Sequence, residues 1–222
     1  TVKAVRKQVQ WDKKTKDNLW QKIIEYKIHN QSKVLYHFTK NKEKLMQLQD
    51  YIDEIKPGDI SNREGHAAKV YFNTIFGNDF SRGDDCIENA MLNYGYAIIR
   101  AYITRAIVSY GYNPSLGIFH KSEYNSFCLA DDFLEIFRPI VDAYVISYLL
   151  EMEEKIKFLS QEVRAWLVDI LSLRVRFENQ YQKISTVIDK FVLQCVDYLD
   201  LDIKNKKMIS NFEINTIEGI EK

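Results

Sequence analysis

Apolar residues recur every three or four positions along most of the chain, the spacing that gives a helix one buried face. The chain has only three prolines, and most of its eight glycines lie between Gly58 and Gly117, so few positions interrupt this pattern. No stretch shows a convincing alternation of apolar and polar residues, as a half-buried strand would. The predicted fold class is therefore all-α, a multi-helix globular domain. The predicted helices cover 17–35, 41–55, 63–76 (ended by Gly77), 84–112, 160–177 and 178–200.

One more helix is predicted to follow a loop over 113–124. Asn125 or Ser126 can cap its first turn. Its apolar positions are spaced for a single buried face: Phe133, Leu134, Phe137, Ile140, Val141 and Tyr144.

Composition narrows the possible partners and the compartment. The 222 residues suggest one large or two small domains, and 31 basic against 31 acidic residues give no overall attraction to a polyanion. A nucleic-acid surface would need local clustering of charge. The three cysteines are widely spaced and form no CxxC pair, which favours a reducing cytoplasm. No apolar run is long enough to span a bilayer.

Three acids on the predicted helix after residue 125 require an explanation. Asp131, Asp132 and Glu135 lie within five positions, and Asp132 and Glu135 are three apart, so their carboxylates neighbour each other. Solvated acids at the start of a helix interact favourably with its dipole. The alternative is a shared cation, which would need ligands from elsewhere in the chain.

Two residues outside that helix could supply such ligands. His120 follows the apolar run "LGIF", and Glu64 lies in "NREGHAAKVYF". Each also has an ordinary interpretation, His120 as a hydrogen-bonded structural residue and Glu64 as a first-turn acid or exposed ion pair. A mixed carboxylate and imidazole set would suit Mg²⁺ or Mn²⁺ better than a structural zinc site. Phosphate-loop and serine- or cysteine-nucleophile motifs are absent from the sequence.

Four segments together resemble a known family. They are "LWQKIIEYKIHNQ" (19–31), "NREGHAAKVYF" (62–72), "NAMLNYGYAIIRAYITRAIVSYGYNPSLGIFH" (89–120) and "YNSFCLADDFLEIFRPIVDAYV" (124–145). In order and spacing they resemble the helical domain of the Cas-one family, the integrases of CRISPR adaptation, in the form found in type II systems. The resemblance covers roughly residues 10–200.

The resemblance implies a metal site. The family's glutamate in an "EG-AA--YF" setting corresponds to Glu64, its histidine at the end of a "GxxH" loop to His120, and its acid before an "F-P" segment to Glu135. These three would be catalytic ligands of Mg²⁺ or Mn²⁺. Asp132 is similar to an extra acid that some members place beside the site. Replacing any of the three ligands is expected to abolish strand joining while leaving the fold nearly intact.

The resemblance also implies an activity and partners. A DNA 3′-hydroxyl would attack the phosphodiester at the CRISPR repeat boundary, joining a spacer to the array. Double-stranded DNA, a Cas-two dimer and a second copy of the full-length protein are the expected partners, in the cytoplasm of a prokaryote. The candidate nucleic-acid contacts are Asn93, Arg100, Lys121 and Arg138. The alternatives are a metal-dependent nuclease without joining activity and a non-catalytic helical scaffold that binds DNA or protein.

The expected domain organisation has three parts. Residues 1–15 are a linker or domain junction, 16–200 the helical metal-dependent domain, and 201–222 a polar tail. Family members begin with a β-strand domain that helps to pair two subunits, and this domain is expected to be missing from the present chain. Because Thr1 is not an initiator methionine, the chain is expected to begin partway through a larger protein or after processing.

Overall fold

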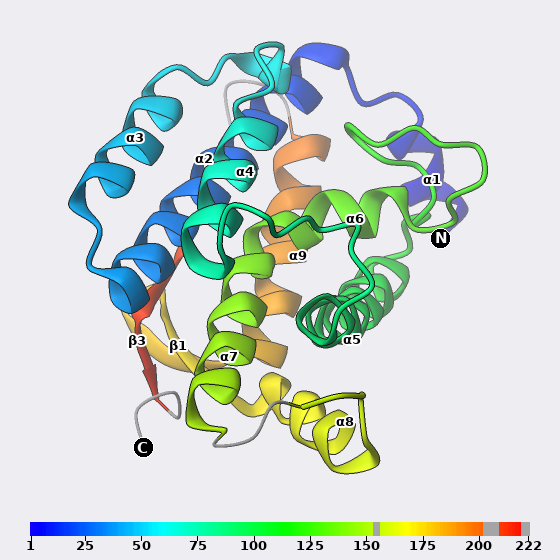
Figure 1. Cartoon of the computed structure of the whole chain (residues 1–222). Coiled ribbons are helices and arrows are strands. Elements are labelled where there is room, and N and C mark those ends of the chain that lie inside the picture. Colours follow the sequence, from blue (N-terminus) through cyan, green and yellow to red (C-terminus); the bar gives the residue numbers. More distant parts are fainter. Residues whose placement is uncertain (153–155, 202–208, 219–222) are drawn as a thin grey trace.

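A computed structural model of the chain describes residues 1–152, 156–201 and 209–218, with the backbone alone over 213–218. Most of the described residues are helical, as predicted (Figure 1). Among them, no helix is both long and apolar enough to cross a membrane. Helices α1–α5 cover Val2–Gln8, Lys13–Thr39, Lys42–Asp53, Arg63–Phe76 and Ile87–Ser109. A short 3-10 helix, η1 (Pro57–Asp59), separates α3 from α4.

The central helix α2 contacts most of the elements that build the site. It packs against α3, η1, α4, η2 and α7, and a wide buried face of apolar side chains along it makes these contacts possible. Its N-terminus is capped by Asp12, whose side chain accepts a hydrogen bond from the backbone N–H of Thr15 at 2.9 Å. Lys40, with a left-handed φ of 55°, ends the helix.

The helix predicted after residue 125 is present but is divided. It forms α6 (Cys128–Leu134), the 3-10 turn η2 (Glu135–Phe137) and α7 (Arg138–Glu151). Pro139 has no backbone N–H to bond to the carbonyl of Glu135 four residues earlier, which explains the tightened turn at this point. The predicted buried face is confirmed: all six of its apolar side chains are buried.

The predicted cap of this helix is wrong. Helix α6 begins at Cys128, and the residue in the capping position is Phe127, whose side chain cannot accept a hydrogen bond. Asn125 instead accepts a hydrogen bond from the backbone N–H of Phe127 at 2.9 Å, which closes a local turn. The backbone N–H of Leu129 is satisfied by the carbonyl of Pro114 at 2.8 Å, so the preceding loop is tied to the first turn of α6.

The expectation of helix throughout 160–200 is wrong in the middle of that range. It contains α8 (Gln161–Val168), the 3-10 helix η3 (Asp169–Ser172), strands β1 (Arg174–Phe177) and β2 (Gln180–Lys183), and α9 (Ile184–Asp200). Glu178 and Asn179 both have positive φ, at 50° and 63°, which is the geometry of a two-residue hairpin turn. The turn escaped prediction because it lacks glycine and because β1 is only four residues long.

A third strand, β3 (Phe212–Glu218), pairs antiparallel with β1, giving the sheet order β2-β1-β3. Phe212 stacks on Phe137 at a ring distance of 5.2 Å, which joins the sheet to the helical core. The sheet is small, and the prediction of a mostly helical domain is confirmed. The proposed junction at 1–15 contains α1 and the start of α2, and residues 202–208 and 219–222 of the proposed tail lie outside the described residues. The three-part division itself stays a prediction.

Candidate metal centre

Three segments far apart in the sequence meet around one cavity of about 250 Å³. Glu64 lies in the first turn of α4, His120 ends the loop before α6, and Glu135 lies in η2. Lys27 of α2 is also part of the lining of this cavity. The three residues that the sequence indicated as ligands therefore line the same cavity.

The position of Glu64 depends on an unusual cap. The Asp59 carboxylate, from the end of η1, accepts hydrogen bonds from the backbone N–H groups of Arg63 and Glu64 at 2.8 and 3.0 Å. These are two of the N–H groups that a helix leaves without partners at its start. Asp59 has a left-handed φ of 45°, which bends the chain so that its side chain reaches back to α4. The cap fixes the turn from which Glu64 enters the cavity.

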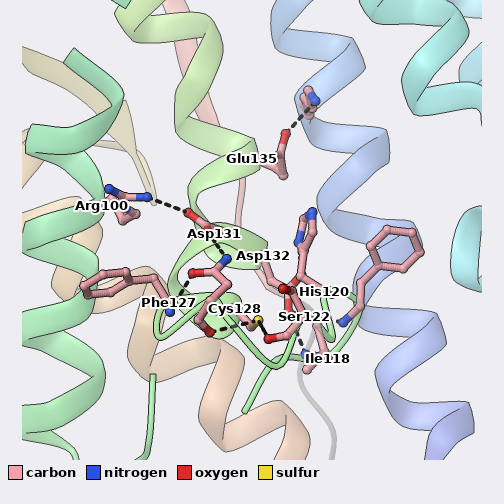
Figure 2. A network of polar contacts seen from close by, with 12 residues as sticks. Arg100, Ile118, His120, Ser122, Phe127, Cys128, Asp131, Asp132 and Glu135 are labelled. Atoms are coloured by element: carbon pink, nitrogen blue, oxygen red, sulfur yellow. Dashed lines mark hydrogen bonds and ion pairs between the residues drawn. The ribbon is translucent and has the colours of Figure 1, made fainter. Parts of the chain in front are cut away.

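His120 is held by Asp132. Its ring Nδ1 lies 2.7 Å from Asp132 Oδ1, and Figure 2 shows the two side chains together beside α6. The same carboxylate accepts hydrogen bonds from the backbone N–H groups of Ile118, Phe119 and His120 at 2.6, 3.1 and 3.1 Å. The hydrogen bond between the His120 ring and the Asp132 carboxylate raises the pKa of His120, whereas burial raises the pKa of Asp132 itself. Because Asp132 binds His120 through Nδ1, the imidazole is oriented with its other nitrogen available to a ligand.

Glu135 is buried between two cations. Its Oε1 accepts a hydrogen bond from Arg138 Nε at 2.8 Å, and its Oε2 accepts one from the Lys27 ammonium. Although burial would raise the pKa of Glu135, Arg138 and Lys27 lower it to about 2. The same Lys27 ammonium also donates to Glu64 Oε1. Burial would lower the pKa of Lys27, but the carboxylates of Glu135 and Glu64 raise it.

The floor of the cavity carries a further carboxyl group. Asp142 of α7 is fully buried, and its Oδ1 accepts a hydrogen bond from the hydroxyl of Tyr96. Burial raises the pKa of Asp142 to about 6, against the opposing effects of Tyr96, Arg138 and Arg82. Arg82 also lines the cavity, with its guanidinium 5.4 Å from the centre of the Tyr96 ring.

The donor set of this cavity fits a divalent metal. Two carboxylates and an oriented imidazole are ligands that Mg²⁺ and Mn²⁺ accept. The carboxylates of Glu64 and Glu135 already converge on one cation, the Lys27 ammonium. Within the part of the chain that is described, no three His, Cys, Asp or Glu side chains are arranged around a common point, so binding a metal requires side chains to close around it.

Residues 1–175 match the protein family described as CRISPR associated protein Cas1. The chain belongs to the Cas1 family. A CRISPR-associated endonuclease Cas1 from Neisseria meningitidis serogroup C (strain 8013) is 38% identical over 191 residues, covering 86% of this chain and 62% of that protein. A second, from Francisella tularensis subsp. novicida (strain U112), is 31% identical over 167 residues, covering 66% and 52%. The chain thus spans a little over half the length of these curated relatives.

Solved structures agree with this assignment. A casposase bound to integration product superimposes with a TM-score of 0.74 at 25% identity, covering 94% of this chain and 67% of that one. A Cas6-RT-Cas1–Cas2 complex gives a TM-score of 0.74 at 19% identity, covering 89% of this chain and 25% of that one, and shows the shared fold. The predicted resemblance to the Cas-one family, which is the Cas1 family, is confirmed.

The four candidate nucleic-acid contacts of this Cas1-family chain fall into different surroundings. Arg138 lines the cavity, with its guanidinium 4.6 Å from the Tyr96 ring centre. Lys121 is exposed beside a second cavity of about 590 Å³ that also adjoins His120. Arg100 lies 3.7 Å from Asp131 and over the ring of Phe127, as Figure 2 shows, so an internal ion pair holds it.

Asn93 is exposed, and its Oδ1 accepts a hydrogen bond from Arg82. Asn89, one turn earlier on α5, accepts from the same guanidinium. These contacts give both asparagines a role in orienting an arginine that lines the cavity.

Lys27 and Arg82 are site residues that sequence reasoning missed. Lys27 lies within the quoted segment of α2, where a lysine next to Ile28 looks like any polar position of an amphipathic helix. A weak signal was available, because Ile23, Ile24, Lys27 and Ile28 share one side of the helix at spacings of three and four. Arg82 lies in an irregular segment between α4 and α5, where periodicity carries no information.

Proposed function

We propose that the chain carries the metal centre of a DNA integrase and endonuclease of CRISPR adaptation, which joins the 3′-hydroxyls of spacer DNA to the repeat by transesterification. The observation that supports the proposal most strongly is the meeting of Glu64, His120 and Glu135 around one cavity, from positions up to 71 residues apart in a Cas1-family chain. Glu64, His120 and Glu135 would hold Mg²⁺ or Mn²⁺. When bound, such an ion supplies a Lewis acid for the scissile phosphate.

The protein's own residues would position and stabilise the reacting groups. Arg138 and Arg82 face the cavity and would offset the charge that develops on a phosphate during transfer. Phosphoryl transfer needs little covalent chemistry from a protein beyond such placement and charge. Asp132, with both oxygens engaged by the 118–120 backbone and His120, would orient that histidine. We propose this role for Asp132 in place of direct ligation.

The second cavity, beside His120, would receive a DNA strand. Lys16 and Lys121 line it and could neutralise phosphates. For this chain we propose double-stranded DNA and a Cas-two dimer as partners, and pairing of two copies in the full-length protein, in the cytoplasm of a prokaryote. The structural relatives include a casposase bound to integration product and a Cas6-RT-Cas1–Cas2 complex, which is in keeping with these partners.

A strand-joining assay tests the proposal. His120→Ala should abolish Mn²⁺-dependent joining of a 3′-hydroxyl DNA end to a supercoiled target. His66→Ala is the matched control, because His66 is exposed on α4 and lies outside the cavity. Joining by His120→Ala at the normal rate would refute the assignment. Cut but unjoined products from the unaltered chain would favour the nuclease alternative, and the absence of a saturable Mn²⁺ site would favour the scaffold.

A further inference from the structure

Lys27 is the most deeply buried cation of the site. Its side chain is 4% exposed, although lysine ordinarily keeps its ammonium in water. Its Nζ contacts Glu64 on α4 and Glu135 on η2, two acids that are not neighbours in the sequence. A buried charge of this kind persists only when it is paired, and here the pair partners are the two proposed carboxylate ligands.

The contacts of Glu135 leave little room for a third cation. Arg138 occupies one carboxylate oxygen and Lys27 the other. A metal that binds Glu135 must therefore take an oxygen from one of them. Arg138 is held in place by its neighbouring turn and by the Tyr96 ring, whereas Lys27 ends a flexible four-carbon chain. Lys27 is also the cation that touches Glu64, so a metal shared by both acids would replace it.

We propose that Lys27 is a built-in counter-ion that holds Glu64 and Glu135 together when no metal is bound and competes with the divalent ion for them. The inference rests on the proposed metal centre. The ammonium keeps two like charges close without a metal, which brings together two of the three proposed ligands. Lys27 is thus a positioning residue that sets the affinity of the site for its metal.

Mn²⁺ calorimetry on the chain and its Lys27→Met variant tests the competition. Methionine has about the length of the lysine stem but carries no charge, so the two acids lose their internal cation. The variant should bind Mn²⁺ at least tenfold more tightly, and should melt lower than the unaltered chain in EDTA but recover in saturating Mn²⁺. Lys22→Met is the matched control on the same helix, because Lys22 pairs with Glu25 away from the cavity. It should leave the Mn²⁺ affinity unchanged.

A measurement on the unaltered chain avoids any loss of folding in the variant. Titration with diamagnetic Mg²⁺ should move the NMR resonance of the Lys27 ammonium, while that of Lys22 stays in place. A Lys27 resonance that does not move as the site saturates would overturn the competition.

The calorimetric outcomes separate the two proposals. If the unaltered chain binds Mn²⁺ in a His120-dependent manner but Lys27→Met binds no more tightly, the competition is wrong and the metal centre stands. If neither protein binds Mn²⁺, both proposals fail.

Discussion

Replacement of Glu135 by glutamine should destabilise the fold, because this side chain stabilises the folded protein through ion pairs as well as being a proposed metal ligand. The glutamine keeps the shape but removes the charge between Lys27 and Arg138, both of which contact Glu135 directly. Arg138 would then lie beside a neutral group, and Lys27 would keep only Glu64. The sequence led us to expect an almost intact fold after replacement of Glu135 by alanine, and the burial of Glu135 alters that expectation.

The magnitude follows from the pKa of Glu135, which lies at about 2 against an ordinary value of 4.5. At about 1.4 kcal/mol per pKa unit, the charged form is favoured by roughly 3 kcal/mol in the folded protein. The side chain is only 6% exposed, so solvent screening removes little of this. For a domain of this size, a loss of that order lowers the melting temperature by about 6–12 °C.

The assay is thermal unfolding followed by circular dichroism in EDTA at pH 7. Glu43→Gln is the control, because Glu43 is 87% exposed, and it should melt within about 1 °C of the unaltered chain. The folded-state pKa of Glu135 is lowered, so its contribution is present above pH 4.5 and is lost as the pH falls from 4.5 towards 2. The gap between the unaltered chain and Glu135→Gln should close over that range. A melting temperature of Glu135→Gln equal to that of the unaltered chain at pH 7 would refute this reasoning.

Three further predictions concern the surroundings of the site. Burial raises the pKa of Asp142 to about 6 from 3.8, so its contribution to stability falls as the pH rises between these values. The free energy of unfolding in urea should therefore be higher for Asp142→Asn than for the unaltered chain by up to about 3 kcal/mol at pH 7, and the two should be equal at pH 4. Asp132→Asn should lower the pKa of His120 in an NMR titration, and an unchanged pKa would contradict the assigned orientation. Gly117→Ala places a Cβ 2.3 Å from the His120 carbonyl oxygen and should cost about 1–3 kcal/mol of stability and weaken Mn²⁺ binding. Gly83→Ala, whose Cβ would meet only Ser81 Oγ at an ordinary contact distance of 3.7 Å, should change neither.

The predictions for Asp132 and Gly117 share a physical basis in the Asp132 carboxylate. It binds the backbone of the 118–120 loop and the His120 ring at once, so the loop and the imidazole are positioned by one buried group. Gly117 lies against the same carboxylate, at 2.8 Å from where its Cβ would be, which explains why a larger residue is not tolerated there. The acids that the sequence places on one apolar helix thus have separate tasks: Asp131 pairs with Arg100, Asp132 supports His120, and Glu135 faces the cavity.

The sequence alone determined the elements whose formation is local. Helices over 63–76 and 84–112 follow from spacings of three and four, and α4 (Arg63–Phe76) and α5 (Ile87–Ser109) form there because each turn buries its own apolar face. The family resemblance, carried by motifs in fixed order, also indicated Glu64, His120 and Glu135.

Only the tertiary structure decided how these residues meet. Lys27 becomes a site residue because α2 packs against both α4 and η2, and no periodicity within 13–39 encodes that contact. The pairing of β1 with β3 joins residues about 40 positions apart, and four residues are too few for an alternating pattern that would predict β1 from the sequence. Local spacing specifies which face of an element is buried, but the contents of a cavity depend on which faces come together when the whole chain packs.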